Sequence, residues 1–452
     1  MPKPVIFIPG FPASELRDGD TTVFPPSPVA LLTAAGRQAF FDAMLDIPGR
    51  LTAGPPIRAV LGIAKQADTL YALLARRGYT IAHEGASVDF APIGWDWRLG
   101  IDDKAVMDAI ANAIRNFAPK KVVPIIHSTG ALVFRAFLDK HPELIPNIEQ
   151  VIAFGGAWCG TLEALFAVHH GHAEGLWKFQ LITEDEGANL VGHAQSAYDL
   201  FPPDPAQTDM GDVNLLHGAD GKPAGANVDL SWIKAGREGY ATPRANSANA
   251  RLGKRSRDFG SLPLTNVVGW GGPTWPAATL SPHNVTFLPP EKEFGDSTVP
   301  FVSASWIQGA DVRTIEIPIG SFVTNQIPEY HAHLWESDAV KQLLNEVLGD
   351  ATRRPVIAVA TDNDNTLDMN ADVTFRITAQ AADGSPLPNL VATAKIPPKQ
   401  IRMPFNGGKR QRLVLKRNDI KPNATGGLFR FLIDFVWDGG SRLNVPATFR
   451  AP

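Results

Sequence analysis

A serine lies in the segment Ile125–Gly130, where an apolar strand pattern gives way to a helical one. A sharp strand-to-helix turn lifts a hydroxyl clear of the sheet to the helix N-terminus, where backbone N–H groups favour an adjacent oxyanion. Ser128 is therefore the candidate nucleophile. A small residue is usual two positions before and two positions after such a serine. Gly130 keeps the second of these, but Ile126 stands in place of the first. Taken alone, a serine in such a turn can also be structural, although the nucleophile interpretation is favoured.

A serine hydroxyl is a weak nucleophile, so it needs a base that an acid orients. With a nucleophile turn of this kind, the three residues follow in the order Ser, Asp or Glu, His. Asp296 lies in the turn Gly295–Pro300, and His331 follows the segment expected to be the last strand. Taken singly, these would be a turn-capping carboxylate and a solvated loop histidine. Their common order favours catalysis, with His333, two residues later on the same loop, as the alternative base.

Strands and helices alternate around the serine. Val5–Ile8 and Val122–Ile126 are short apolar runs, typical of strands that are covered on both faces. Apolar residues at helical spacing precede the second run, and Ala131–Lys140 again fits a helix. Val151–Phe154 is the next buried strand. This alternation predicts an α/β fold with a mostly parallel sheet covered by helices.

The pattern changes twice further along the chain. From about 161 to 260 it loosens into amphipathic and Pro/Gly-rich stretches, which we interpret as a cap inserted above the sheet. After residue 352, polar and apolar residues alternate in short runs separated by glycine turns, which predicts an antiparallel β-sandwich of about 100 residues. We therefore expect a catalytic domain over residues 1–351, with its cap at about 161–260, and a β-sandwich domain over 352–452.

The composition excludes several classes of partner and site. The 452 residues include 42 Lys and Arg and 46 Asp and Glu, which gives a formal net charge of −4. Because nucleic-acid binding usually requires an excess of positive charge, nucleic acid is not an expected partner. The single cysteine, Cys159, cannot form an intramolecular disulfide or assemble a zinc site by itself. No window approaches about 18 uninterrupted apolar residues, and the N-terminus has no signal-peptide pattern. We expect no transmembrane segment and a cytoplasmic location, with export by another route left open.

Six motifs, in order, resemble those of the lecithin:cholesterol acyltransferase-like family, a branch of the α/β-hydrolases that includes bacterial lipases, phospholipases and acyltransferases. They are similar to its opening strand with the oxyanion loop, its Tyr-Asp-Trp-Arg-Leu signature, the turn after the strand that follows the nucleophile, a cap motif, the acid loop and the histidine loop. They lie at Val5–Leu16, Gly94–Leu99, Gly155–Gly160, Ser196–Pro202, Gly295–Pro300 and His331–Leu334. The resemblance covers roughly residues 4–348.

The resemblance implies an α/β-hydrolase fold with an inserted cap and a catalytic triad of Ser128, Asp296 and His331. It also implies an oxyanion hole formed by the backbone N–H groups of Phe11 and Thr129, which directly follow the first strand and the nucleophile. No cofactor and no metal are implied. With one cysteine, the disulfides of secreted animal members cannot form, so neither their lid geometry nor their lipoprotein partners are expected.

Weaker features have plainer interpretations. In Trp95–Arg98, an ion pair and core packing are favoured over head-group binding. His169–His172 could ligate a metal, but histidines at a helix C-terminus are also favoured by the helix dipole. The run Asp362–Thr366 begins like a calcium loop, yet Leu367 stands where the loop needs glycine, so a linker turn is favoured. Cys159 is expected to be a small buried residue.

The sequence therefore predicts a serine hydrolase that cleaves carboxylic esters through an acyl-enzyme on Ser128. Lipid or phospholipid esters are implied by the resemblance. The alternative is an acyltransferase that passes the acyl group to an acceptor alcohol, and a third possibility is a non-catalytic binding protein on a hydrolase scaffold. Acyl length, oligomeric state and the role of the β-sandwich do not follow from the sequence.

Overall fold

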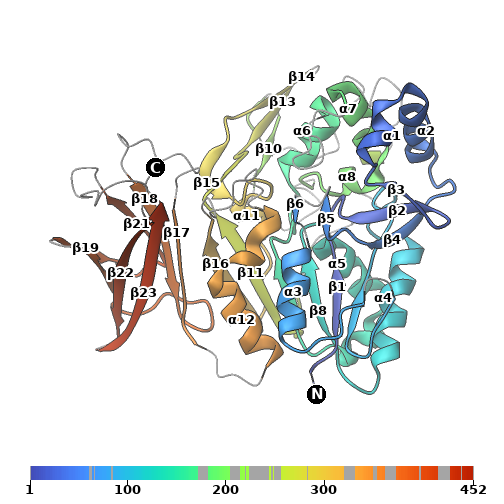
Figure 1. The fold of residues 1–452 in the computed structure, drawn as a ribbon. Helices are drawn as coiled ribbons and strands as arrows, with labels where there is room; N and C mark the ends of the chain where they lie inside the picture. Colours follow the sequence, from blue (N-terminus) through green and yellow to red (C-terminus); the bar gives the residue numbers. More distant parts are fainter. Residues whose placement is uncertain are drawn as a thin grey trace.

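The fold was obtained as a computed structural model, drawn in Figure 1. Part of the cap, His172 and the Asp362–Thr366 run lie outside the residues that the structure describes. The described residues are 2–60, 64–65, 67–82, 85–171, 182–203, 214–218, 220–222, 244–245, 248, 256–281, 284–319, 331–349, 354–361, 373–396, 399–415, 428–438 and 440–450.

A six-stranded sheet forms the centre of the α/β part (Figure 1), and all its pairings are parallel. The parallel sheet predicted from the alternation of elements is thus confirmed. In spatial order its strands are β16 (Val312–Pro318), β11 (Leu264–Trp270), β9 (Val151–Phe154), β8 (Val123–His127), β1 (Val5–Ile8) and β7 (Phe90–Pro92).

Helices cover both faces of this sheet. Ile6 and Ile8 of β1 pack into one apolar core with helices α4 and α5, whereas Val5 and Phe7 pack into another with α3 and α12. Because successive strand residues point to opposite faces, a strand covered on both sides must be apolar throughout, as β1 is. The four helices are α3 (Asp68–Arg76), α4 (Lys104–Phe117), α5 (Gly130–Lys140) and α12 (Asp338–Leu348).

Of the helices that the structure describes, five lie beyond one end of the sheet (Figure 1), and three of them, α6 to α8, fall within the predicted cap. None of the described helices combines the length and the apolarity that crossing a bilayer requires. The five are α1 (Pro28–Leu32), α2 (Ala34–Leu45), α6 (Leu162–His170), α7 (Glu184–His193) and α8 (Gln195–Asp199).

Short elements complete the α/β part. Among the described residues they comprise a β3-β2-β4 sheet, a β10-β13-β14 sheet, the pairs β5-β6 and β12-β15, one short α-helix and two 3-10 turns. Their bounds are β2 (Ser14–Asp18), β3 (Thr21–Phe24), β4 (Thr52–Pro56), β5 (Ala59–Val60), β6 (Ala64–Lys65), β10 (Leu216–His217), β12 (Gly272–Thr274), β13 (Ala278–Ser281), β14 (Asn284–Phe287), β15 (Glu291–Gly295), α11 (Phe301–Ala304) and the 3-10 turns Pro142–Asn147 and His331–Glu336.

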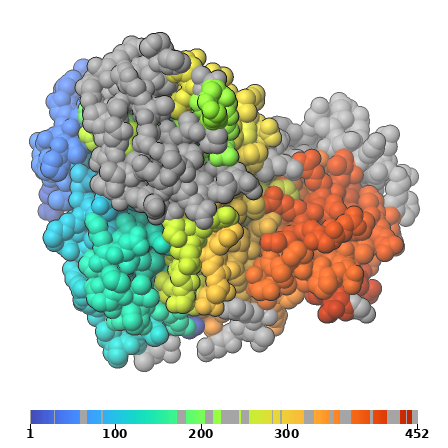
Figure 2. All heavy atoms as spheres, turned by 180° about the vertical axis from the view of Figure 1, so that it is seen from behind, coloured from blue at the N-terminus to red at the C-terminus, as the bar shows by residue number. Residues whose placement is uncertain are grey.

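Two antiparallel sheets follow, of order β17-β18-β21 and β20-β19-β22-β23. Phe375 and Ile377 of one sheet share an apolar core with Ile433 and Phe435 of the other, which confirms the predicted β-sandwich. Seen from behind, it forms a lobe beside the α/β part (Figure 2). Its strands are β17 (Val356–Thr361), β18 (Val373–Gln380), β19 (Val391–Ile396), β20 (Lys399–Pro404), β21 (Arg410–Leu415), β22 (Leu428–Trp437) and β23 (Ser441–Arg450).

Candidate active site

Ser128 occupies the tight turn between β8 and α5, with a φ of 55°. A non-glycine residue in this left-handed region is strained, and such strain often marks functional turns. Two glycines let the first strand approach the turn. A Cβ on Gly10 would lie 2.5 Å from the Cβ of Ser128, and one on Gly130 would lie 2.5 Å from the carbonyl oxygen of Ile8. Ile126, the departure from the small-residue pattern, is fully buried in the apolar core.

Asp296 and His331 form a buried hydrogen-bonded pair. The distance between Asp296 Oδ2 and His331 Nδ1 is 2.6 Å. The other carboxylate oxygen accepts the backbone N–H groups of Thr298, at 3.2 Å, and Val299, at 2.8 Å. Because an ionised carboxylate only accepts, the imidazole proton belongs on Nδ1. Within the described residues, Nε2 of His331 has no hydrogen-bond partner, so it is available as a base.

Gly155, at the end of β9, leaves the space that this pair fills. A Cβ there would lie 2.8 Å from His331 Cε1 and 2.9 Å from Asp296 Oδ2. Its φ of 54° is also one that side chains rarely adopt. The sequence indicated a turn at this position but not this contact.

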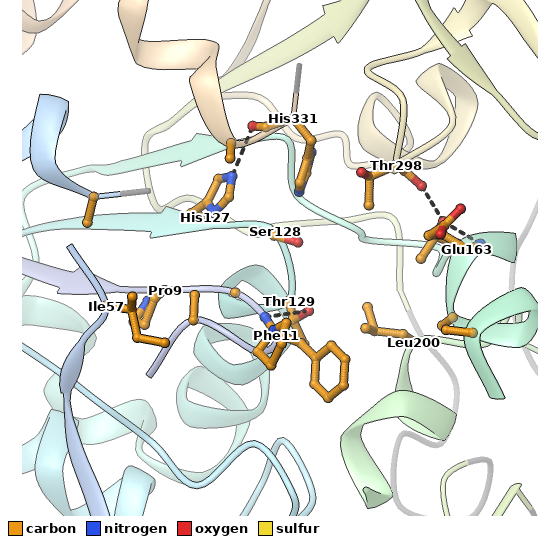
Figure 3. A pocket seen from close by; sticks show the side chains of 18 of the residues that line it. Pro9, Phe11, Ile57, His127, Ser128, Thr129, Glu163, Leu200, Thr298 and His331 are labelled. Carbon is orange, nitrogen blue, oxygen red and sulfur yellow. Dashed lines mark hydrogen bonds between the residues drawn. The ribbon is translucent and has the colours of Figure 1, made fainter. Parts of the chain in front are cut away.

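Ser128 and His331 line one cavity of about 130 Å³, and the His331 ring points toward Ser128 (Figure 3). Phe7, Ile57 and Leu200 give it apolar walls, and Glu163 lies at its cap side. The alternative base His333 is not among the residues that line it; its Nδ1 lies 3.0 Å from Glu336 Oε1. The structure therefore brings His331, rather than His333, to the acid and the serine.

Both expected oxyanion donors lie at this cavity. The N–H of Phe11 donates to the hydroxyl of Thr129 at 3.3 Å, so the loop after β1 touches the first residue after the nucleophile. The loop is held by two indoles, since Trp95 Nε1 donates to the carbonyl of Pro9 at 3.0 Å and Trp97 Nε1 to that of Ser14 at 3.3 Å. The aromatic signature thus supports the oxyanion loop.

The charged residues of the same signature are structural. Arg98 pairs with Asp96 at 2.7 Å; Arg98 is buried, and the side chain of Asp96 is 9% exposed. The Arg98 guanidinium also donates to carbonyl groups at the end of α2, including those of Ala43 and Met44. The ion pair favoured by the sequence is confirmed.

His127 is a residue of the site that sequence reasoning missed. Its Nε2 lies 3.2 Å from the backbone carbonyl oxygen of His331, and the two rings are 4.7 Å apart. Burial, and next the neighbouring His331, hold the pKa of His127 well below its ordinary value. A neutral ring that faces a carbonyl carries its proton on Nε2 and donates it. His127 therefore holds the backbone of His331, and nothing in its type or spacing signalled this.

Other candidates from the sequence lie apart from this chemistry. In the described ranges, no group of three or more His, Cys, Asp and Glu is arranged to hold a metal ion. The His170 ring packs against Phe166, with centroids 4.5 Å apart. Cys159 is buried, as expected.

Solved structures resemble the chain distantly. A chain of the Tle4–Tli4 complex is 15% identical, covers 75% of this chain and 96% of its own, and has a TM-score of 0.48. The mature lipase BlEst2 of Bacillus licheniformis is 10% identical, with 77% and 92% covered and a TM-score of 0.29. Phospholipase PlaB from Legionella pneumophila is 11% identical, with 98% and 90% covered and a TM-score of 0.25. Because these TM-scores are low, the fold assignment rests on the observed parallel sheet and on the turn that carries Ser128.

Comparisons by sequence identify one family. No curated protein matches the chain. The family model for lecithin:cholesterol acyltransferase matches residues 65–221, a span that contains Ser128 but neither Asp296 nor His331. Over these residues the chain is similar to the lecithin:cholesterol acyltransferase family, and the resemblance indicated by its motifs is confirmed.

Proposed function

We propose that the protein is a serine hydrolase that cleaves carboxylic esters through an acyl-enzyme on Ser128. The observation that carries this proposal is the buried Asp296–His331 hydrogen bond of 2.6 Å, with His331 facing the cavity that Ser128 lines. Acyl transfer requires a nucleophile, a base and an acid that orients the base. Ser128 lies on a strained turn, Nε2 of His331 has no partner among the described residues, and Asp296 accepts three hydrogen bonds.

The chemistry follows from these positions. Nε2 of His331 takes the Ser128 proton as the hydroxyl attacks an ester carbonyl, while Asp296 keeps the imidazole in the productive tautomer. The N–H group of Thr129, and that of Phe11 on exchanging its 3.3 Å hydrogen bond to the Thr129 hydroxyl for one to substrate, donate to the oxyanion that forms. His331 then gives its proton to the departing alcohol, and an incoming water or alcohol resolves the acyl-enzyme by the reverse sequence.

The proposed substrates are lipid or phospholipid esters. Two observations support this class: the mainly apolar lining of the cavity, and the similarity of residues 65–221 to a lipid acyltransferase family. The same family match supports acyl transfer to an alcohol as the second candidate activity. Both activities share the first half-reaction and differ only in what attacks the acyl-enzyme.

Labelling with a fluorophosphonate tests the nucleophile. We expect the native protein to be labelled and Ser128→Ala to be unlabelled. Ser385→Ala, which removes the hydroxyl of an exposed hairpin turn, is the matched control and should label like the native protein. Equal labelling of the native protein and Ser128→Ala would refute the assignment.

A substrate panel then separates the two activities. Short aryl esters, long-chain triacylglycerols and diacyl phospholipids are each incubated with and without an acceptor alcohol, and the products are quantified. Free acid as the main product in both conditions supports hydrolysis. A new ester that replaces most of the free acid when alcohol is present supports transfer instead.

A further inference from the structure

The β-sandwich meets the α/β part at an edge of the catalytic sheet. Edge strand β16 lies against β17 and β18 of the sandwich. Buried polar groups join the two parts: Trp270 Nε1 donates to Thr378 Oγ1 at 2.8 Å, and Gln380 Nε2 donates to the carbonyl of Glu316 at 2.9 Å. Such satisfied buried contacts fix one relative orientation of the parts.

Arg410 contacts two aromatic residues that lie next to the segment carrying the proposed catalytic acid. From β21 of the sandwich, its guanidinium lies 3.8 Å from the ring centroid of Phe301 and 4.8 Å from that of Trp270. Its Nε donates to Glu316 Oε2 at 2.6 Å, which orients the guanidinium. A planar cation held over two aromatic rings by an ion pair is a rigid, favourable arrangement.

Both aromatic residues flank the loop that carries Asp296. Phe301 begins α11 directly after Pro300, where the acid loop ends. Trp270 ends β11 and leads into Gly272, which bridges to Asp296; a Cβ on Gly272 would lie 2.5 Å from the backbone nitrogen of Ser297. The loop is thus held between two segments that Arg410 contacts.

We propose that Arg410 is a positioning residue for Asp296, so that the C-terminal β-sandwich forms part of the catalytic unit. By holding Trp270 and Phe301 together, the guanidinium keeps the acid loop where its carboxylate meets Nδ1 of His331. The inference rests on the proposed function, because it acts through the proposed acid.

Steady-state hydrolysis of p-nitrophenyl butyrate by the full-length protein tests this role. Arg410→Leu is expected to lower kcat by roughly 10-fold to 100-fold and to change KM by less than about 2-fold, as for a displaced catalytic group. Arg410→Lys, which keeps the charge but not the planar contact, should recover part of the loss. Arg402→Leu, an exposed arginine on β20, is the matched control and should behave as the native protein.

A double-mutant cycle separates positioning from a structural effect. If Arg410 acts through Asp296, Arg410→Leu should cost little further activity in an Asp296→Asn background. An equal loss in both backgrounds, or native kcat for Arg410→Leu, would overturn the inference. Should Arg410→Leu fail to fold, Phe301→Leu removes the other side of the contact and must show the same cycle.

The outcomes also distinguish this inference from the proposed function. Absence of hydrolysis by the native protein, or hydrolysis that survives Ser128→Ala, refutes the proposed function. If hydrolysis depends on Ser128 but does not change when Arg410 is replaced, only the proposed positioning role of Arg410 and the β-sandwich is refuted.

Discussion

At the scale of single residues, Gly155 shows how closely the acid and the base are packed. Its position has two requirements that only glycine meets together: a left-handed backbone, and no atom where a Cβ would stand between the Asp296 carboxylate and the His331 ring. The first requirement concerns stability, because a side chain at positive φ is strained. The second concerns chemistry, because the clash would fall on the proposed catalytic pair itself.

Gly155→Ala should therefore lose activity as well as stability. We expect kcat to fall by roughly 100-fold, the effect of shifting a catalytic group by about 1 Å, and the free energy of unfolding to fall by about 1–3 kcal/mol. Ester hydrolysis and urea unfolding measure the two effects. Gly78→Ala is the control, because Gly78 has a φ of 86° but open space around its Cβ position. It should lose stability alone, and equal activity of the two variants would contradict the proposed clash.

At the scale of elements, one carboxylate links helix α7, in the predicted cap, to helix α2 near the N-terminus. Glu186 completes a capping box with Thr183 at the start of α7. The same carboxylate accepts from Nε of Arg37, on α2, at 2.6 Å. The Arg37 hydrogen bond, aided by those from Thr183, lowers the pKa of Glu186 to about 2.

This lowered pKa predicts how the attachment of α7 responds to acid. A carboxyl whose pKa is lower in the folded state stabilises the protein above its unfolded pKa, near 4.5, and that stabilisation disappears as the pH falls toward about 2. Since the pair is partly exposed, we expect Glu186→Gln to cost about 1 kcal/mol at pH 7. The difference from the native protein should shrink steadily below about pH 4.5.

Urea unfolding at a series of pH values from neutral to acid measures this difference. Glu184→Gln, at an exposed position in the first turn of the same helix, is the matched control and should show a smaller effect at neutral pH. A Glu186→Gln effect that stays constant with pH would show that the charge of Glu186 is not what stabilises the attachment.

At the scale of the whole molecule, the two parts are joined by polar groups that burial makes costly to separate. Trp270 is 2% exposed and Thr378 is fully buried, and their hydrogen bond crosses the junction. Glu316 is 8% exposed and pairs with both Lys409 and Arg410 from the sandwich. The junction is therefore specific in geometry, as a positioning role requires.

Thr378→Val should weaken this junction without changing its shape. The indole N–H of Trp270 would be left buried without an acceptor, which costs about 1–3 kcal/mol. Differential scanning calorimetry or urea unfolding measures the loss. Thr374→Val, on the same strand but opposite the exposed Val414, is the control and should change stability by less than about 0.5 kcal/mol. Equal losses from both substitutions would argue against a structural role for the Trp270 hydrogen bond.

Much of the fold was predictable because its signals are local. The wholly apolar run Val5–Ile8 requires cover on both faces, and the alternation of such runs with helical segments specifies a parallel sheet. The strands after residue 352 are recognisable from the alternation of polar and apolar residues and from the glycine turns between them. Ser128, Asp296 and His331 were chosen as candidates for a similar reason, since each lies in a turn with a recognisable pattern and the three follow a known order.

The sequence by itself therefore determined the fold class and three candidate residues, because backbone periodicity and turn chemistry act over a few neighbouring residues. Only the tertiary structure decided which histidine meets Asp296, since His331 and His333 differ in where one 3-10 turn points their rings. It also revealed His127 behind the base and Arg410 beside the acid loop. These contacts join residues far apart in the chain, and the packing of whole elements, which no local pattern encodes, brings them together.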